Sequence, residues 1–397
     1  MRLARRVQNI KESPTLAITA KAKMMKARGI NIIGFGAGEP DFDTPRHIKD
    51  AAIRAIDEGF TKYTQVGGID ELKDAIIEKF RKDNDLQYTR EEVLVSCGGK
   101  HSFFNLCQAL FEEGNEVIIP SPYWVSYPVM VSMAGATPVI VPTREDKGFK
   151  MTHEEFDKSI TPATKALVIN SPSNPTGVVY SAEELMAIAE IAVKNNISII
   201  SDEIYEKLCY DDTHFISMAS ISDNVKRQTV VLNGVSKAYS MTGWRIGYAA
   251  GSKELIKAMT NIQSQSTSNP SSISQKAAVE ALCGAQDTIV EMLREFDKRR
   301  RFIVDGLNSI EGITCTMPAG AFYVFPNISA FFKRSYKGKI IGGSIEFADF
   351  LIDVAEVAVV PGRPFGAEGH VRLSYAMSME NIAEGIKRIA EAVRRLE

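Results

Sequence analysis

The chain has 397 residues, of which 45% are hydrophobic and 24% charged, and its formal net charge at pH 7 is −2. This composition is typical of a globular protein and excludes a largely disordered or fibrous chain. At roughly 100–200 residues per domain, the length predicts two or three domains, or one large domain with a smaller partner. The near-zero net charge gives no electrostatic footprint for binding nucleic acid or an acidic membrane surface.

The cysteines and the N-terminal residues indicate where the protein works. The cysteines are odd in number, widely spaced and without a C-x-x-C pair, which argues against a disulfide framework or a zinc site and favours a reducing cytosol. The basic start, M-R-L-A-R-R-V-Q-N-I-K, is not followed by the apolar core of a secretory signal. No stretch of about 20 apolar residues is present either. We therefore expect a cytoplasmic α/β enzyme with no metal, membrane or nucleic-acid partner.

Short apolar segments rich in β-branched residues alternate with helical patterns along the middle of the chain. We expect strands at 92–96, 116–120, 138–141, 166–170, 197–201, 229–233 and 247–250. Segments such as 101–111 and 182–194 have the 3.6-residue period of helices. Continuously apolar strands are buried on both faces. Their alternation with helices predicts a mostly parallel sheet that is covered by helices on both sides.

The two ends of the chain differ from the middle. Residues 1–30 are typical of an arm followed by a helix, and a long charged helix is expected at 289–312. After it come β-like stretches at 321–325 and 358–361, a strand at 370–375 and a terminal helix around 380–396. We interpret both ends as a smaller α+β domain. The predicted boundaries are 1–43 for the arm and part of the small domain, 44–285 for the large domain and 286–397 for the small C-terminal domain. The basic segment 333–344 is expected to be an exposed loop, with substrate gating as the alternative.

Polar motifs follow several of the expected strands, at the sheet edge where open α/β sheets bind ligands. They are S-C-G-G-K-H at 96–101, S-P-Y-W at 121–124, N-S-P-S-N-P-T-G at 170–177 and S-D-E-I-Y at 201–205. The glycine pair of the first motif opens a helix, whose free N–H groups make an anion site. Each motif alone is weak, because N-P-T-G is usually only a turn and Asp202 is a common type of helix N-cap. Trp124 alone is as readily a core residue.

The segment 234–247, G-V-S-K-A-Y-S-M-T-G-W-R-I-G, adds chemistry to these motifs. A lone lysine after a strand is usually a solvated loop cation. Here Lys237 follows Ser236, and Arg245 lies eight residues later between two glycines. An amine nucleophile beside an anion cradle is what an aldehyde cofactor with a phosphate arm requires.

This segment resembles the pyridoxal-phosphate attachment signature of the class I and II aminotransferases. Further matches are R-R-V-Q at 5–8, S-P-T at 13–15, G-A-G-E-P-D-F-D-T-P at 36–45, S-P-Y-W-V-S-Y-P at 121–128 and G-H-V-R-L-S-Y-A at 369–376. The resemblance covers nearly the whole chain, and the subgroup it most resembles is the bacterial aspartate aminotransferases of subgroup Iβ. It implies fold type I, with a mostly parallel seven-stranded sheet between helices and a smaller α+β domain.

The resemblance implies pyridoxal 5′-phosphate as the cofactor. In the family, Lys237 holds the cofactor covalently and then moves a proton between the substrate Cα and the cofactor C4′. Asp202 keeps the pyridine nitrogen protonated, and Tyr205 and Asn174 donate hydrogen bonds to the phenolic oxygen. The remaining contacts are Trp124 against the ring and, around the phosphate, Ser236, Arg245, the backbone of Gly99, Lys100 and His101, and Tyr63 from a neighbouring subunit. Tyr63 therefore predicts a homodimer with shared sites, and the alternative is an ordinary surface tyrosine.

The substrate carboxylates need fixed cations. Arg372 is a single arginine inside an apolar strand, and a buried arginine needs an anion. The alternatives are an internal salt bridge and, by resemblance, a bidentate clamp on the substrate α-carboxylate, assisted by the backbone of Gly38. The resemblance assigns the side-chain carboxylate to Lys100, with help from Thr15 and Lys11 of the arm. Trp124 and Asn174 also face the substrate. His101 departs from the family pattern, which has a glutamine there.

The implied reaction converts L-aspartate and 2-oxoglutarate to oxaloacetate and L-glutamate in two half-reactions. Alternatives on the same scaffold are an aminotransferase for aromatic amino acids, alanine or prephenate (which forms arogenate), a C–S lyase and an aminocyclopropane-carboxylate synthase. A non-catalytic pyridoxal-binding regulator would carry a winged-helix domain first, but here the motifs begin within residues 1–40. A Rossmann dehydrogenase is excluded because no G-x-G-x-x-G follows the first strand.

Overall fold

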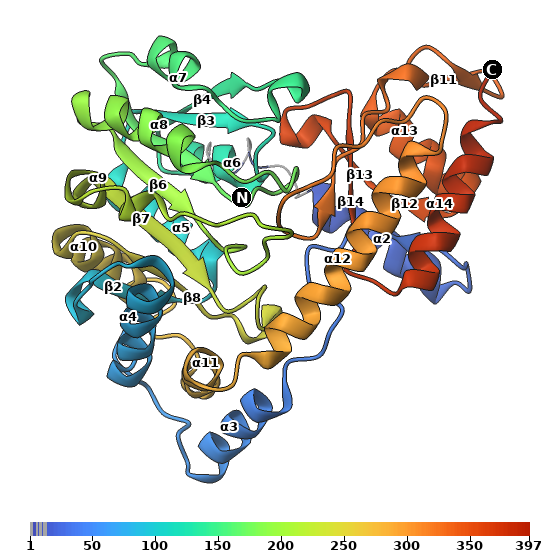
Figure 1. Ribbon diagram of the computed structural model, residues 1–397. Coiled ribbons are helices and arrows are strands. Elements are labelled where there is room, and N and C mark those ends of the chain that lie inside the picture. The colour runs from blue at the N-terminus through green and yellow to red at the C-terminus, as the bar shows by residue number, and fades with distance from the viewer. Residues whose placement is uncertain (1–2, 5–6, 8–9, 11–13) are drawn as a thin grey trace.

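The computed structural model describes residues 3–4, 7, 10 and 14–397. These residues form two lobes, a larger one around a wide twisted sheet and a smaller one around short strands, with α12 (Asp287–Asn308) running from the first to the second (Figure 1). The lobes match the predicted division into a large and a small domain in outline, while the boundaries at 43 and 285 stay predictions.

The large lobe is built on a seven-stranded sheet with the order β2-β8-β7-β6-β5-β3-β4. Its strands are β2 (Val93–Ser96), β3 (Glu116–Ser121), β4 (Thr137–Pro142), β5 (Thr164–Asn170), β6 (Ser198–Asp202), β7 (Thr229–Gly234) and β8 (Gly247–Ala250). Only β8 runs antiparallel to its neighbours. All seven strands predicted from the sequence are confirmed. The register sets Asn170 beside Asp202 and Asp202 beside Leu232, so three strands end at one edge.

Helices cover both faces of this sheet because its strands bury alternate side chains in opposite layers. Val117 and Ile119 of β3 pack in one apolar layer, with α5, α6 and α10, whereas Ile118 packs in the other, with α7, α8 and α9. Helices α4 and α11 extend the second layer beneath β2 and β8. The helices are α3 (Arg46–Asp57), α4 (Asp70–Asn84), α5 (Gly99–Leu110), α6 (Ser126–Met133), α7 (His153–Ser159), α8 (Ala182–Lys194), α9 (Asp223–Gln228), α10 (Lys253–Ser264) and α11 (Ser272–Cys283).

The small lobe combines both ends of the chain, as expected. It contains α2 (Pro14–Ala27), β1 (Ile33–Gly34), β9 (Tyr323–Val324), α13 (Ser344–Phe350), β12 (Val357–Ala358), β13 (Val360–Pro361), β14 (Val371–Ser374) and α14 (Met379–Val393). The single stretch predicted at 358–361 is wrong, because the chain changes partner at Val359. Strand β12 pairs with β1, whereas β13 joins the antiparallel sheet β13-β14-β9.

The segment expected as a loop at 333–344 instead contains a short hairpin, β10 (Ser335–Tyr336) and β11 (Lys339–Ile340). Gly338 has a φ of 78°, the left-handed conformation that a tight hairpin turn requires. Strand β11 is exposed and β10 is partly buried, and the hairpin lies beside the C-terminus at the far end of the small lobe (Figure 1). Short single-turn helices complete the chain: η1 (Arg90–Glu92), η2 (Glu145–Lys147), η3 (Met218–Ser220), η4 (Thr242–Trp244), η5 (Ser329–Phe331), η6 (Leu351–Ala355, a π-helix) and η7 (Arg363–Phe365).

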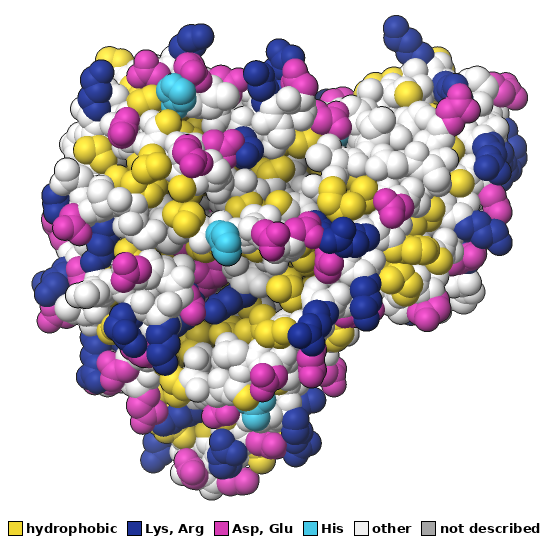
Figure 2. Space-filling model, viewed as in Figure 1, with side chains coloured by type: hydrophobic (Ala, Val, Ile, Leu, Met, Phe, Trp, Pro, Cys, Tyr) yellow, Lys and Arg dark blue, Asp and Glu magenta, His cyan; other side chains and the backbone are white. Residues whose placement is uncertain are grey.

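The surface carries both signs of charge. On the face drawn in Figure 2, basic and acidic side chains alternate and no large area of one sign is visible. Within the described part of the chain, no helix is both long and apolar enough to cross a membrane.

Candidate active site

A cavity of about 400 Å³ opens where β5, β6 and β7 end, between the two lobes. The segment 36–39, Tyr323 and Arg372 line it from the small-lobe side. It brings together most of the side chains that the sequence singled out. These are Gly38, Gly99, Lys100, Trp124, Asn174, Asp202, Tyr205, Ser236, Lys237, Arg245 and Arg372. Residues from both ends of the chain therefore meet the strand ends of the sheet at one site.

Lys237 follows β7 and extends into this cavity. Its Nζ donates a hydrogen bond to the Gly38 carbonyl at 2.6 Å and lies 5.9 Å from the centroid of the Tyr205 ring. Burial lowers the pKa of Lys237 to about 8, and Arg372 and Arg245 add to this effect against the opposing charges of Glu39 and Asp202. An amine with a pKa near neutrality is a nucleophile and base, which an ordinary lysine is not.

An anion cradle lies at the N-terminus of α5. As the first two residues of that helix, Gly99 and Lys100 carry N–H groups that have no partner within it. The Arg245 guanidinium lies against this turn and donates to the carbonyls of Thr242 (2.9 Å) and Cys97 (3.2 Å). A glycine is required at position 98, because its φ is positive and a Cβ there would come within 2.3 Å of the Arg245 guanidinium. Helix N–H groups, a guanidinium and the adjacent Ser236 hydroxyl are donors typical of a phosphate-binding site.

Asp202 lies at the end of β6, facing the cavity. Tyr127 of α6 donates a short hydrogen bond to its Oδ2, and the backbone N–H of Ile204 donates to Oδ1 at 3.3 Å. Burial raises the pKa of Asp202, while the Tyr127 hydrogen bond, the Ile204 N–H and the Lys237 charge oppose that rise. A carboxylate held in this way is oriented to pair with a protonated nitrogen of a ligand.

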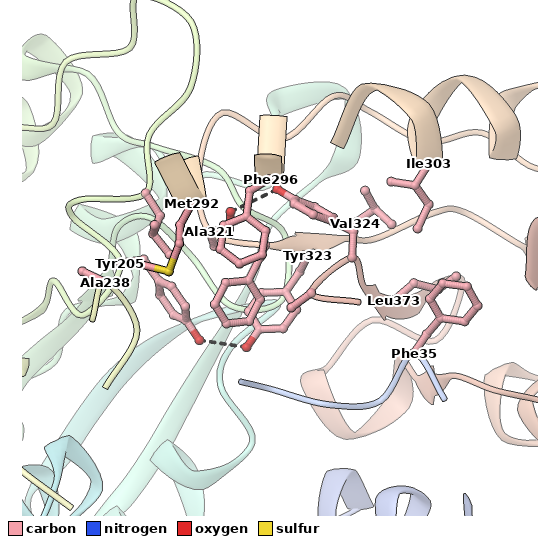
Figure 3. Close-up of a cluster of buried hydrophobic side chains, with 14 of the residues drawn as sticks. Phe35, Tyr205, Ala238, Met292, Phe296, Ile303, Ala321, Tyr323, Val324 and Leu373 are labelled. Atoms are coloured by element: carbon pink, nitrogen blue, oxygen red, sulfur yellow. Dashed lines mark hydrogen bonds between the residues drawn. The ribbon is translucent and has the colours of Figure 1, made fainter. Parts of the chain in front are cut away.

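Tyr205 and Asn174 line the same cavity and bond to small-lobe residues. The Tyr205 and Tyr323 hydroxyls lie 2.9 Å apart, within the aromatic cluster shown in Figure 3. The Asn174 Oδ1 accepts a hydrogen bond from Arg372 at 2.9 Å. The Asn174 amide N–H₂ is thus left as a donor toward a ligand.

Arg372, on β14, is 2% exposed. Its guanidinium donates to the Asn174 Oδ1 and to the Gly36 carbonyl, both at 2.9 Å, and lies 4.4 Å from the Tyr323 ring centroid. Its Nε is buried without a hydrogen-bond partner, and burial lowers its pKa. Among the described residues no carboxylate pairs with it, so the internal salt bridge considered above is not formed. A buried cation with neutral partners only is a site for an anionic ligand.

Lys100 and Trp124 line the cavity together. The Lys100 Nζ lies 5.0 Å from the centroid of the Trp124 ring, and burial, with the nearby Arg245 charge, lowers the pKa of Lys100. The Trp124 ring makes an edge-on contact with Tyr127 at 5.1 Å, which holds its orientation. The cavity therefore offers an aromatic face with a cation above it.

Three predicted residues, His101, Tyr63 and Thr15, are not among those that line the cavity. The backbone N–H of His101 donates to the Gly98 carbonyl at 2.9 Å, and its role at the phosphate stays a prediction. Its Nδ1 accepts from the Cys97 N–H at 3.2 Å. Tyr63 is 91% exposed and lies outside the cavity of its own chain. Thr15 is the second residue of α2, and Lys11 lies outside the described residues.

The sequence analysis missed several residues of the site, notably Tyr127, Tyr323, Glu39 and Lys23. Glu39 accepts a hydrogen bond from the Thr242 hydroxyl at 2.8 Å, which ties the segment 36–39 to the loop after Lys237. Tyr127 had a usable signal, since it follows Trp124 by three residues, the spacing of one helical turn. Tyr323 had none, because a tyrosine within A-F-Y-V-F is typical of a core strand. Among described residues no three metal-ligating side chains gather together.

Comparison with known proteins agrees with this geometry. The family model described as aminotransferase class I and II matches residues 30–389. The chain is 52% identical, over 99% of both chains, to the aspartate aminotransferase of Bacillus sp. strain YM-2. It is 53% identical, over 98% of its length and 99% of the relative's, to the aspartate/prephenate aminotransferase of Nitrosomonas europaea. The solved aspartate aminotransferase of Thermus thermophilus with maleate superposes with a TM-score of 0.93 at 47% identity, over 99% of this chain and 100% of the other.

Proposed function

The chain belongs to the class I and II aminotransferases, and on that basis we propose that it is a pyridoxal-phosphate-dependent aspartate aminotransferase. It would convert L-aspartate and 2-oxoglutarate to oxaloacetate and L-glutamate by two alternating half-reactions. The observation that carries the proposal is the pairing of two groups in one cavity. Arg372 is a buried cation without a carboxylate partner among the described residues, and Lys237 is an amine whose pKa burial lowers to about 8.

The cavity's donor set fits pyridoxal 5′-phosphate. A phosphate would be held by the first N–H groups of α5, by Ser236 and by Arg245, in a turn that a Cβ on Gly98 would fill. Trp124 would lie against the ring, Asp202 at its nitrogen, and Tyr205 and Asn174 at its phenolic oxygen. Lys237 would bind the aldehyde carbon through its amine. When bound, this cofactor supplies an electron sink for negative charge that develops at the substrate Cα.

The protein's own residues would then orient the substrate and move the proton. Arg372 would bind the α-carboxylate through its two terminal nitrogens, with the N–H of Gly38 beside it. Lys237 would take the proton from the substrate Cα and deliver a proton to the cofactor C4′. An amine with a pKa of about 8 can both accept and donate a proton near neutral pH. The Asp202 carboxylate, fixed by Tyr127, would keep a positive charge at the ring nitrogen.

Lys100 is our candidate for the side-chain carboxylate of aspartate, together with Thr15 and Lys11. A cation above the Trp124 ring in a partly buried position favours a second anionic group in the substrate. The relative from Thermus thermophilus was solved with maleate, a dicarboxylate, which supports the same substrate class. A second candidate function is the transamination of prephenate, because the relative from Nitrosomonas europaea is named for both activities.

We further propose a homodimer in which Tyr63 reaches the phosphate site of the partner subunit, because this tyrosine is almost fully exposed in the single chain. We also propose a cytoplasmic location, which the scattered, odd number of cysteines supports.

The proposal is tested with aspartate alone. We expect aspartate to convert the absorbance of the protein-bound aldehyde to that of the amine, and 2-oxoglutarate to reverse it, with both changes lost in Lys237→Ala. A lyase would instead release ammonia without stoichiometric conversion. If aspartate left the spectrum unchanged while arogenate reacted, prephenate transamination would be the function and the role of Lys100 would be wrong. Absence of any cofactor spectrum would overturn the proposal.

A further inference from the structure

A buried polar cluster lies directly behind the cavity, on the reverse side of the loop that carries Asp202 and Tyr205. We call it the Lys79 cluster, and it consists of Lys79, Asn84, Glu206 and Asn233. Each of these residues is at most 9% exposed. The aminotransferase chemistry does not use Lys79, Asn84 or Glu206, and the burial of an ion pair costs free energy that an apolar pair would not. The cluster therefore needs a reason other than stability.

The loop after β6 presents its side chains in two directions. Asp202 and Tyr205 face the cavity, whereas the neighbouring carboxyl groups, Glu203 and Glu206, turn into the protein interior. Glu203 accepts hydrogen bonds from the Ser201 hydroxyl at 2.8 Å, the Ser217 hydroxyl at 2.8 Å and the Met218 N–H at 3.2 Å. Each cavity-facing residue of this loop is thus followed in sequence by a buried carboxyl group that anchors the loop to the protein interior.

Glu206 connects three separate segments. It forms a short ion pair with Lys79 of α4, it accepts from the Asn84 amide at 3.0 Å, and it accepts from the Asn233 amide at 2.9 Å. Lys79 in turn donates to the Asn84 Oδ1 at 2.7 Å, which closes a ring of contacts around the carboxylate. Both oxygens of the Glu206 carboxylate are therefore held by buried partners.

Asn233 connects the Lys79 cluster to the segment that carries Lys237. It lies four residues before Lys237, lines the cavity, and accepts the Gly234 N–H at 2.7 Å, so that both ends of its amide are bonded. The backbone that follows is closely packed, since a Cβ on Gly234 would come within 2.9 Å of the Gly247 Cα. The direction in which the chain leaves β7 toward Lys237 is thus set by one amide whose partner is Glu206.

We propose that Glu206, held by Lys79, is a positioning residue that fixes the Asp202–Tyr205 loop relative to the strand end that carries Lys237. The inference rests on the proposed function, because it concerns the same cofactor site. The hydrogen bond from Asn233 to Glu206 joins the two segments that carry the cavity groups, and the ion pair with Lys79 of α4 holds Glu206 in place. A displacement of about 1 Å at such a site costs up to a hundredfold in rate.

Two double variants separate positioning from stability. Lys79→Met/Glu206→Leu removes the ion pair and the bond to Asn233 while it keeps the volume buried. Lys79→Gln/Glu206→Gln removes the charges but leaves an amide oxygen for Asn233. Each variant is purified without cofactor and titrated with pyridoxal 5′-phosphate, and the pH midpoint of the bound-cofactor absorbance and the melting temperature are recorded.

We expect the Met/Leu variant to fold, to bind pyridoxal 5′-phosphate about tenfold or more weakly, and to shift the pH midpoint. The Gln/Gln variant should keep a cofactor affinity and a pH midpoint close to those of the parent. If the Met/Leu variant folds with the affinity and midpoint of the parent, the proposal is overturned. If it fails to fold, Asn233→Ser decides, since it loses the bond to Glu206 with little change in the core. Parent-like affinity and midpoint in Asn233→Ser would then overturn the proposal.

The chain provides a matched control. Lys207 and Asp83 are the sequence neighbours of Glu206 and Asn84, and they form an ion pair of 2.7 Å between the same two segments. Their side chains are nearly 30% exposed, and neither lines the cavity. Lys207→Met should therefore leave cofactor affinity and midpoint unchanged. A parent protein that binds no pyridoxal phosphate would instead contradict the proposed function, so the two failures are distinguishable.

Discussion

The hydroxyl groups of Tyr205 and Tyr323 lie 2.9 Å apart and connect the loop after β6 to strand β9 of the small lobe (Figure 3). Burial raises the pKa of both groups, so both stay protonated at neutral pH. One hydroxyl therefore donates to the other, and the pair is the only route by which Tyr205 satisfies its oxygen among the contacts of the described residues. The residue proposed to meet the cofactor's phenolic oxygen is thus also a contact between the lobes.

Removal of the Tyr323 hydroxyl should destabilise the cofactor-free protein. In Tyr323→Phe the buried Tyr205 hydroxyl loses its partner, and we expect the free energy of unfolding to fall by about 1–2 kcal/mol. Urea denaturation of the cofactor-free protein measures this. Tyr336→Phe, on the hairpin at the far end of the small lobe, is the control and should change stability by less than about 0.5 kcal/mol. Equal effects of the two substitutions would contradict a special role for the Tyr205–Tyr323 contact.

The amine of Lys237 should titrate near pH 8 in the cofactor-free protein, because burial lowers its pKa from 10.5 to about 8. Between about pH 8 and 10.5 this lysine is protonated in the unfolded chain but neutral in the folded protein. The free energy of unfolding therefore rises as the pH rises through this window. Below pH 8 its destabilising effect is present in full. Isotope-labelled methylation of the lysines, followed by NMR, gives the pKa directly.

A comparison with Lys237→Met checks the sign of this effect. The variant lacks the buried charge, so it should be more stable than the parent at pH 7, and the difference should shrink as the pH approaches 10.5. A lysine pKa above 10, or a stability difference that does not depend on pH, would count against the buried amine.

Arg372→Lys should impair substrate binding far more than cofactor binding. A lysine cannot make the bidentate contact with a carboxylate, and it loses the planar stacking on Tyr323 that the guanidinium has at 4.4 Å. We expect the apparent KM for aspartate to rise by about tenfold to a hundredfold, since one charge-assisted hydrogen bond contributes about 1.5–3 kcal/mol. Stopped-flow measurement of the aspartate half-reaction gives this value.

The control for this prediction is Arg363→Lys. Arg363 is an exposed arginine of the same lobe, and its 3.7 Å pair with Glu368 lies outside the cavity. The control should leave both the half-reaction and cofactor binding as in the parent. If Arg372→Lys weakened the binding of pyridoxal phosphate as strongly as that of aspartate, Arg372 would not be a substrate clamp.

The large sheet was predictable from sequence because its strands are buried on both faces and therefore appear as unbroken apolar runs. The same geometry explains why the sequence pointed to this edge: β5, β6 and β7 run parallel and end together, so the segments that follow them and carry Asn174, Tyr205 and Lys237 had to meet. Strand β8 was predicted as a strand, yet its antiparallel direction depends on the connection 235–246, which contains η4, and is not encoded in its own composition.

Contacts that depend on side-chain direction were not predictable. In the sequence, Tyr127 and Tyr323 resemble ordinary core residues and Glu206 resembles a surface acid. In the structure, each of the three has a buried polar partner. The predicted phosphate contact of the His101 backbone also depends on local geometry. The first turn of α5 closes with a bond from His101 to Gly98, and sequence does not reveal which of the first N–H groups of a helix stay free.

Two backbone segments approach closely at the phosphate cradle, and a substitution at this point tests the proposed cofactor. A Cβ on Gly247 would come within 2.2 Å of the Gly99 N atom, so Gly247→Ala should push the N-terminus of α5 away from Arg245. We expect weaker binding of pyridoxal 5′-phosphate, by about tenfold or more, because the anion site is geometrically fixed. Gly243→Ala is the matched control four residues earlier, since a Cβ there meets no atom within 4 Å. Equal affinities of the two variants would contradict the cradle.

Shared active sites can be tested by mixing two inactive variants. Tyr63 is 91% exposed in the single chain, and our proposal assigns it to the phosphate site of the partner. In a mixed dimer of Lys237→Ala and Tyr63→Ala chains, one site carries both defects and the other carries neither. Random pairing of equal amounts should therefore restore about a quarter of the parent activity. If Tyr63 served its own chain, each site of the mixed dimer would have one defect and no activity would return. If Tyr63 were an ordinary surface residue, Tyr63→Ala alone would already be fully active.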